Sequence, residues 1–199
     1  MPATSAELNT VPAVAPEADV EALRTSATPP FSDNLDRLGD LIGLQRCEHT
    51  GKRVGAALTV KSRPGDNLGF SHALAVMKPG HVIVIDGGAG LNNALYGDMM
   101  RAYAVSRGCT GFMVDGAIRA IATFAAGDLP CYARGVGHRG PYKSGPAQIN
   151  LPVSVGNQVV NTGDVVSGDD DGLIAFSPDQ PKALIDDARQ AAPRARHHG

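Results

Sequence analysis

The sequence predicts a mixed α/β fold, and the order of its apolar segments carries that prediction. An apolar run from Val82 to Ile85 leads into a glycine-rich stretch, and a helical pattern and a second apolar run follow it. This β-loop-α-β order is typical of a parallel strand pair joined by a right-handed crossover. The last third of the chain alternates short strand patterns with turn signals such as Gly156-Asn157. We therefore expect a central βαβ unit and a strand-rich C-terminal part.

The length of the chain favours one compact domain. Its 199 residues, 43% of them hydrophobic, are enough for one buried core and too few for two large ones. Residues 1–30 carry 5 of the 14 prolines, so we expect a flexible N-terminal arm there. We then expect a single domain over residues 31–192 and a disordered tail over residues 193–199.

Helical spacing appears at three places outside this arm. Residues 34–44 place four apolar side chains on one face and end at Gly43, which predicts a helix. A second helix is predicted over residues 97–107, with Asp98 as its N-cap and Gly108 in the left-handed position after its end. A short surface helix is predicted over residues 182–192. Strands are predicted over residues 53–61, 81–85, 111–114 and 131–136, and in several short runs between 152 and 176.

Composition and charge exclude several function classes. The formal net charge is -2 and the isoelectric point is about 6.3, so no excess of basic residues favours nucleic acid or an anionic membrane. No apolar run approaches the roughly 20 residues that cross a bilayer, and the N-terminus has no signal-peptide pattern. The three cysteines are far apart and form no CxxC pair, which argues against a disulfide framework. We expect a cytoplasmic protein without nucleic-acid or membrane partners.

The site is expected where the central strands end. In parallel βαβ units, ligands bind beyond the carboxyl ends of the strands, which here means residues 86–100 and 115–120. The glycines of residues 87–90 are compatible with a phosphate loop or with a simple tight turn. The sequence lacks the Gly-Lys-Ser/Thr of a Walker loop, and Asn93 stands where a dinucleotide motif needs glycine. Both nucleotide interpretations therefore fail.

Two features at these strand ends are suited to a small carboxylate. A helix that starts at Gly97 exposes the backbone N–H groups of residues 97–100 together with the positive end of the helix dipole. Arg119 follows Asp98 by 21 positions, so one helix and one strand bring it back to the same edge. Its planar guanidinium suits a carboxylate or an enolate oxygen. The ordinary alternatives are a plain N-cap at Asp98 and a solvated loop arginine.

The segments VIDGGAGLNNALYGDMM (residues 84–100) and GFMVDGAIR (residues 111–119) resemble one aldolase signature. They are similar to the class II 4-hydroxy-4-methyl-2-oxoglutarate/4-carboxy-4-hydroxy-2-oxoadipate aldolases. These enzymes share a fold with the regulator of ribonuclease E activity A proteins. The resemblance covers roughly residues 30–178 and includes HRGPYK at residues 138–143 and GDDDG at residues 168–172.

This resemblance implies a compact α/β/β fold of the swivelling-domain kind, assembled as a homotrimer or homohexamer. It implies cleavage of 4-hydroxy-2-oxo acids to pyruvate, with oxaloacetate decarboxylation as a side activity. The small 2-oxo acid would be bound by Gly97, Asp98, Met99, Met100 and Arg119, with Arg119 and Asp98 as catalytic residues. A divalent metal, Mg²⁺ or Mn²⁺, would assist, and Asp98 would orient a water near it.

One position departs from the family pattern. The family places a metal-ligating aspartate directly after the arginine, whereas this chain has Ala120. Asp98 alone would be a weak ligand, so metal-dependent activity is expected to be weakened or lost. A natural loss, an engineered change and a site rebuilt from other carboxylates (Asp86, Asp115, Asp128, Asp169, Asp170 and Asp171) all remain open. The rival hypothesis is a non-catalytic, protein-binding scaffold like the regulator branch, which also lacks that aspartate. For residues 138–143, contact of His138 and its neighbours Arg139, Tyr142 and Lys143 with an anionic substrate and an ordinary exposed polar loop both remain open.

Overall fold

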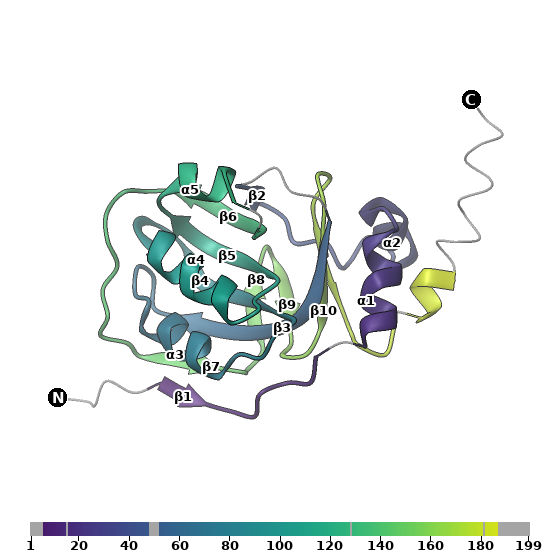
Figure 1. The fold of residues 1–199 in the computed structure, drawn as a ribbon, viewed down its shortest axis with the longest axis horizontal. Coiled ribbons are helices and arrows are strands. Elements are labelled where there is room, and N and C mark those ends of the chain that lie inside the picture. Colours follow the sequence, from purple (N-terminus) through teal and green to yellow (C-terminus); the bar gives the residue numbers. More distant parts are fainter. Residues whose placement is uncertain (1–5, 15, 48–51, 128, 181, 187–199) are drawn as a thin grey trace.

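The structure, a computed structural model, describes residues 6–14, 16–47, 52–127, 129–180 and 182–186. Within these residues one nine-stranded sheet has the order β1-β7-β3-β4-β5-β6-β2, with β10 paired to β3 and β11 to β10 (Figure 1). Its strands are β1 (Ala6–Leu8), β2 (Gln45–Arg46), β3 (Arg53–Ser62), β4 (His81–Tyr96), β5 (Gly111–Ile118), β6 (Cys131–Val136), β7 (Ala147–Ile149), β10 (Val165–Gly168) and β11 (Leu173–Phe176). A separate hairpin pairs β8 (Val153–Val155) with β9 (Gln158–Val160).

Three short helices connect the parallel centre of the sheet. Strands β3, β4, β5 and β6 are mutually parallel, and α3 (Leu68–Val76), α4 (Asp98–Ser106) and α5 (Ile121–Ala125) lie between them in the chain. The register pairs Val82 with Gly111 and Ile85 with Val114. The predicted βαβ unit is therefore confirmed, including the helix at residues 98–106 and the left-handed Gly108 after it.

The two faces of the sheet carry different layers. On one face, Phe70 of α3, Ala104 of α4 and Phe124 of α5 pack into one buried cluster with the sheet. On the other face, the β8–β9 hairpin contributes Val153 and Val160 to a second cluster. Because both faces are buried, the central strands are almost continuously apolar. This helix, sheet and hairpin order confirms the predicted α/β/β fold.

The prediction of a helix over residues 34–44 is wrong. The helix in this region, α2 (Thr28–Asn34), starts earlier, with prolines in its first turn, where a missing N–H is tolerated. Asp36 and Arg37 then take left-handed backbone angles. Leu41 N–H donates to the carbonyl of Leu173 at 3.0 Å, and Ala175 N–H donates to Gly39 at 3.0 Å. Pairing with β11 therefore replaces helical bonding in a segment whose apolar spacing alone resembles a helix.

The glycine stretch at residues 87–90 is part of β4 and forms no open loop. Strand β4 continues to Tyr96, and its register against β5 shifts several times after Asp86. Gly87 is required by close packing, since a Cβ there would lie 2.4 Å from Leu95 Cδ1 and 2.9 Å from the carbonyl oxygen of Asp115. The glycines therefore serve a bulged strand, and no described contact makes them a phosphate loop.

The N-terminal segment differs from the flexible arm expected over residues 1–30. Within its described part, β1 pairs in parallel with β7, and α1 (Glu17–Arg24) follows. Val20, Leu23 and Phe31 are buried against β10, β11 and the C-terminal residues Leu184 and Ile185. Burial of apolar side chains thus outweighs the local proline content.

At the other end of the domain, residues 182–186 are helical, as predicted for the start of that segment. The rest of the predicted helix and the tail at residues 193–199 lie outside the described residues. In the described part of the chain, no helix has the length and apolar character needed to cross a membrane.

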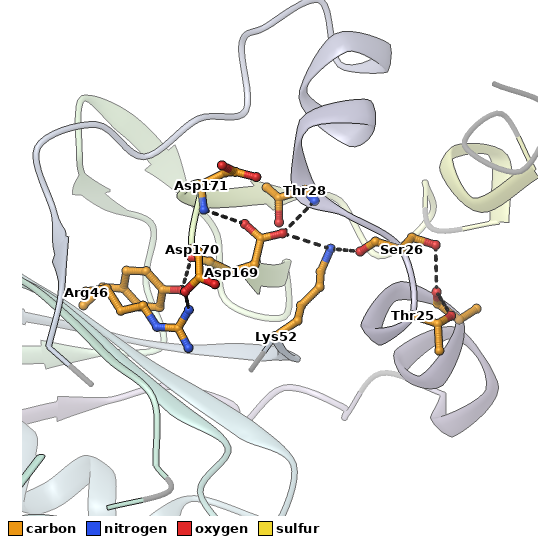
Figure 2. A network of polar contacts seen from close by, with 10 residues as sticks. Thr25, Ser26, Thr28, Arg46, Lys52, Asp169, Asp170 and Asp171 are labelled. Atoms are coloured by element: carbon orange, nitrogen blue, oxygen red, sulfur yellow. Dashed lines mark hydrogen bonds and ion pairs between the residues drawn. The ribbon is translucent and has the colours of Figure 1, made fainter. Parts of the chain in front are cut away.

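A polar network attaches the N-terminal segment to the loop at residues 168–172 (Figure 2). Asp169 accepts a hydrogen bond from Thr28 N–H at 2.8 Å and lies 3.9 Å from Lys52 Nζ. Lys52 also donates to the carbonyl of Ser26, and its Nζ lies 4.7 Å from the ring centroid of Phe31. The neighbouring Asp170 pairs with Arg46. Two of the three aspartates of the GDDDG segment therefore have structural partners.

This network predicts a pH dependence of stability. Burial lowers the pKa of Lys52 from 10.5 to about 8, and the attraction of Asp169 offsets only part of that effect. Between pH 8 and 10.5 the unfolded chain therefore holds more protons than the folded protein, so the free energy of unfolding rises with pH. Relative to Lys52→Met, we expect wild-type protein to gain up to about 1.4 kcal/mol per pH unit there. Urea unfolding at several pH values measures this, and parallel curves for the two proteins would contradict it.

Candidate active site

The register of two parallel strands brings the predicted site residues together. Tyr96, at the end of β4, pairs with Ile118, at the end of β5, so the residues that follow them are neighbours. Arg119 N–H donates to the carbonyl of Tyr96 at 3.0 Å. A Cβ on Gly97 would lie 3.2 Å from both Cγ and Nε of Arg119. The guanidinium arm therefore runs directly past the start of α4.

A cavity of about 140 Å³ lies between these groups. All five residues expected to hold the substrate line it: Gly97, Asp98, Met99, Met100 and Arg119. The remaining lining residues come from β4, the start of α3 and a later loop: Asn67, Leu95, Tyr96, Pro141 and Lys143. At about 30 Å³ per water molecule, this volume holds roughly five waters. It is far below the 300–1,000 Å³ of typical ligand pockets and therefore suits a small ligand.

The start of α4 supplies unpaired N–H donors. Gly97 is the N-cap, which corrects the expectation that Asp98 caps the helix. The first helical hydrogen bond runs from Arg101 N–H to the Gly97 carbonyl at 3.0 Å, and Asp98 Oδ1 accepts the N–H of Met99 at 2.9 Å. No residue of the described chain accepts the N–H of Asp98 or Met100. These donors and the helix dipole favour an anion.

Two cations line the same cavity without partners. Among the residues that the structure describes, neither Arg119 nor Lys143 has an ion-pair partner within 4.0 Å. The carboxylate of Asp98, which lines the same cavity, is therefore not paired with either of them. Lys143 comes from the loop at residues 138–143, for which the sequence left substrate contact and an exposed polar loop as alternatives. His138, from the same loop, lies instead beside a second depression of about 490 Å³, which Arg119 and Ala120 also line.

Asn67 and Tyr96 are polar residues at the cavity that the sequence did not single out. Asn67 is 4% exposed, donates through Nδ2 to Met100 Sδ at 3.3 Å, and has no described partner for Oδ1. Burial raises the pKa of Tyr96 well above its usual value, so its phenol stays neutral. The ring of Tyr96 packs against Phe70, with ring centroids 5.0 Å apart. Tyr96 therefore belongs to the core, while Asn67 retains a free acceptor at the cavity wall.

The described residues do not fit a divalent metal at this cavity. Asp98 is the only acid in its lining, and no three His, Cys, Asp or Glu residues of the described chain are grouped closely enough to hold a metal. Mg²⁺ prefers octahedral oxygen coordination and uses carboxylates for part of it. Ala120 offers no donor at the position where the family has aspartate.

The other carboxylates considered from the sequence have different environments. Asp115 is bound by Arg134 and accepts the N–H of Gly156 at 3.1 Å. Asp86 lines a different hollow beside Lys61, and residues 169–171 belong to the region of the network in Figure 2. Asp128 lies outside the described residues. None of the described carboxylates replaces the missing ligand.

Two larger hollows lie elsewhere among the described residues, and the arginine that lines each of them is ion-paired. One of about 520 Å³ has Arg37 paired with Asp33 at 2.8 Å and Asp40 bound by Ser32 at 2.9 Å. The other, of about 510 Å³, is lined by residues of β3, β4 and β7. Volume therefore does not identify the site, whereas the unpaired Arg119 beside the start of α4 does.

Comparison with known proteins shows the family of this chain. The RraA-like family, described as Aldolase/RraA, matches residues 28–175. A protein of Halalkalibacterium halodurans, named "Putative 4-hydroxy-4-methyl-2-oxoglutarate aldolase", is 35% identical over 172 residues, which cover 86% of this chain and 82% of that protein. A protein of the same name from Alcanivorax borkumensis is 32% identical over 155 residues, which cover 77% of this chain and 94% of that protein.

A solved structure extends the comparison to the fold. Streptomyces coelicolor RraAS2, described as an unusual member of the RNase ES inhibitor RraA protein family, matches with a TM-score of 0.81 at 22% identity, over 93% of this chain and 100% of that one. At this identity the match concerns the fold alone. With a family match over residues 28–175 and relatives above 30% identity, the chain belongs to the RraA-like family of aldolases and RraA proteins.

Proposed function

We propose that the cavity at Arg119 binds the 2-oxo acid end of a small substrate and that the chain is a carbon–carbon lyase of the aldolase branch. The observation that carries this proposal is the set of unpaired groups around a volume of about 140 Å³: the Arg119 guanidinium, the Lys143 ammonium and the N–H groups at the start of α4. A carboxylate beside a carbonyl needs several donors in this arrangement. The names of the two bacterial relatives support the same substrate class.

The proposed substrates are 4-hydroxy-2-oxo acids. In their cleavage the C3–C4 bond breaks and its electron pair moves into the pyruvyl part as an enolate, while the 4-hydroxyl gives its proton to a water molecule and becomes a carbonyl. A proton from water then adds to C3 and gives pyruvate. Arg119 and Lys143 would stabilise the negative charge of the enolate oxygen, and Asp98 would orient the water. Oxaloacetate decarboxylation passes through the same enolate.

The chain's residues support this chemistry without a resident metal. Ala120 removes the donor on which a metal-assisted reaction depends, so the two cations are the groups that stabilise negative charge here. We therefore expect slow cleavage, with substrate binding that is independent of divalent ions.

Pyruvate binding tests the cavity directly. Because Arg119 supplies charge-assisted hydrogen bonds worth roughly 1.5–3 kcal/mol, Arg119→Ala should weaken pyruvate binding by about 10- to 100-fold. Isothermal titration with and without EDTA measures this, and chelator should leave wild-type affinity unchanged. Equal affinity of wild type and Arg119→Ala would contradict the proposal.

The volume beside Arg119 is tested by Gly97→Ala. The new Cβ would lie 3.2 Å from Arg119 Cγ and Nε and push the guanidinium away from the cavity, while the backbone at φ -154° accepts alanine without strain. We expect pyruvate affinity to fall several-fold in titration, with the melting temperature little changed. Gly111→Ala is the matched control, because the nearest atom to its new Cβ is 3.5 Å away. An equal loss in both variants would count against this account.

Ala120→Asp tests the role of the missing ligand. Ala120 has a left-handed backbone (φ 61°, ψ 40°), which aspartate adopts more readily than most residues, so the variant should fold. We expect pyruvate release from oxaloacetate or 4-hydroxy-4-methyl-2-oxoglutarate to become Mg²⁺-dependent and to rise at least about tenfold, since a bound metal supplies several kcal/mol to a developing enolate. Wild-type turnover should not respond to Mg²⁺. If neither protein binds pyruvate or releases it, the non-catalytic scaffold becomes the better hypothesis.

A further inference from the structure

Two segments far apart in the sequence meet beside the cavity. The turn at residues 65–67 leads into α3 and supplies Asn67, and the loop at residues 141–143 supplies Pro141 and Lys143. Tyr142 N–H donates to the carbonyl of Gly65 at 2.8 Å, and Asn67 N–H donates to the carbonyl of Tyr142 at 3.0 Å. The two segments therefore pair edge to edge over a short stretch.

A single buried carboxylate lies at this junction. Asp66 is 1% exposed, and its Oδ1 accepts the N–H of Leu68 at 3.0 Å. Its Oδ2 accepts the N–H groups of Ser144 at 2.8 Å and Gly145 at 3.0 Å. Arg63 lies 3.1 Å from the same oxygen. Three backbone donors from two segments thus converge on the side chain of Asp66. Asp66 directly precedes Asn67, and the donor Ser144 directly follows Lys143.

The loop has a second attachment on its other side. Asn93 Nδ2 donates to the carbonyl of Gly140 at 2.6 Å, and Ala94 N–H donates to the carbonyl of Arg139 at 2.8 Å. Lys143 therefore lies between a fixed point on β4 and the carboxylate of Asp66. Loss of the Asp66 contacts would release one end of the short segment that carries the lysine.

We propose that Asp66 is a positioning residue for the 2-oxo acid site: its carboxylate holds residues 144 and 145 and thereby fixes the Lys143 ammonium and the Asn67 side chain at the cavity. This inference rests on the proposed function, because it assigns Lys143 to ligand binding. Asp66 does not line the cavity, so it acts through its neighbours.

The charged form of Asp66 is the one suited to this role. Burial alone raises the pKa of Asp66, but the hydrogen bonds from Leu68, Ser144 and Gly145 and the charge of Arg63 outweigh it and lower the pKa below its usual value. A carboxylate accepts all three N–H groups, whereas an asparagine has one acceptor oxygen and an NH₂ group that would face other donors. Arg63 is half exposed, so its ion pair contributes less than the buried backbone bonds.

A double-mutant cycle on pyruvate affinity tests the proposal. We expect Asp66→Asn and Lys143→Met each to weaken pyruvate binding about tenfold, the range for losing one charge-assisted contact. The double variant should lose less affinity than the two single losses combined, because Asp66 acts partly through Lys143 and coupled residues are not additive. Asp164→Asn is the matched control: Asp164 is also buried and accepts the N–H of Asn161 at 2.7 Å in a turn away from the cavity, so it should affect stability without changing affinity.

Hydrogen exchange separates failure of this inference from failure of the proposed function. In Asp66→Asn the amides of residues 144 and 145 should exchange faster, whether or not pyruvate binds. If wild-type protein does not bind pyruvate, the proposed function fails, and this inference fails with it whatever the exchange result. If wild-type protein binds pyruvate but the affinity losses of the two single variants are additive, the positioning role alone is overturned. The same holds if exchange at the amides of residues 144 and 145 is unchanged in Asp66→Asn. Should Asp66→Asn not fold, Asp66→Ser keeps a short-range acceptor for the start of α3 and enters the same cycle.

Discussion

The parallel pairing of β4 with β5 is the constraint on which the site depends. Because Tyr96 and Ile118 are register partners, the chain leaves the sheet at two adjacent points, and the residues after them, Gly97 and Arg119, share one cavity. The absence of a side chain at Gly97 leaves room for the arginine, and the helix start beside it supplies N–H donors. The register of β4 against β5 thus places the Arg119 guanidinium beside the start of α4.

Sequence reasoning succeeds where local order dictates spatial order. The strand, helix and strand of residues 82–118 lie in succession, so the convergence of Gly97 and Arg119 follows from the crossover rule alone. It fails at residues 34–44, where pairing with β11 overrides an apolar spacing typical of a helix. The sequence leaves the role of the Lys143 loop open and does not indicate Asn67, because tertiary contacts place both beside the cavity and no local pattern marks those contacts.

The site departs from its family at one residue, and its surroundings do not compensate. Asp115 and residues 169 and 170 are bound by partners of their own, and among the described residues Asp98 is the single acid that lines the cavity. What the chain retains is a set of unpaired donors around Arg119, which supports the proposed binding of an anionic 2-oxo acid. Under that proposal, binding of the substrate head and metal-assisted turnover are separable properties, and this chain is suited to the first.

The most direct measurement is a crystal structure of the protein with bound pyruvate. The account predicts that the pyruvate carboxylate lies between the Arg119 guanidinium and the N–H groups at the start of α4, with the Lys143 ammonium near the 2-oxo group. Pyruvate bound in another hollow of the molecule, or a vacant Arg119 cavity at saturating pyruvate, would contradict it.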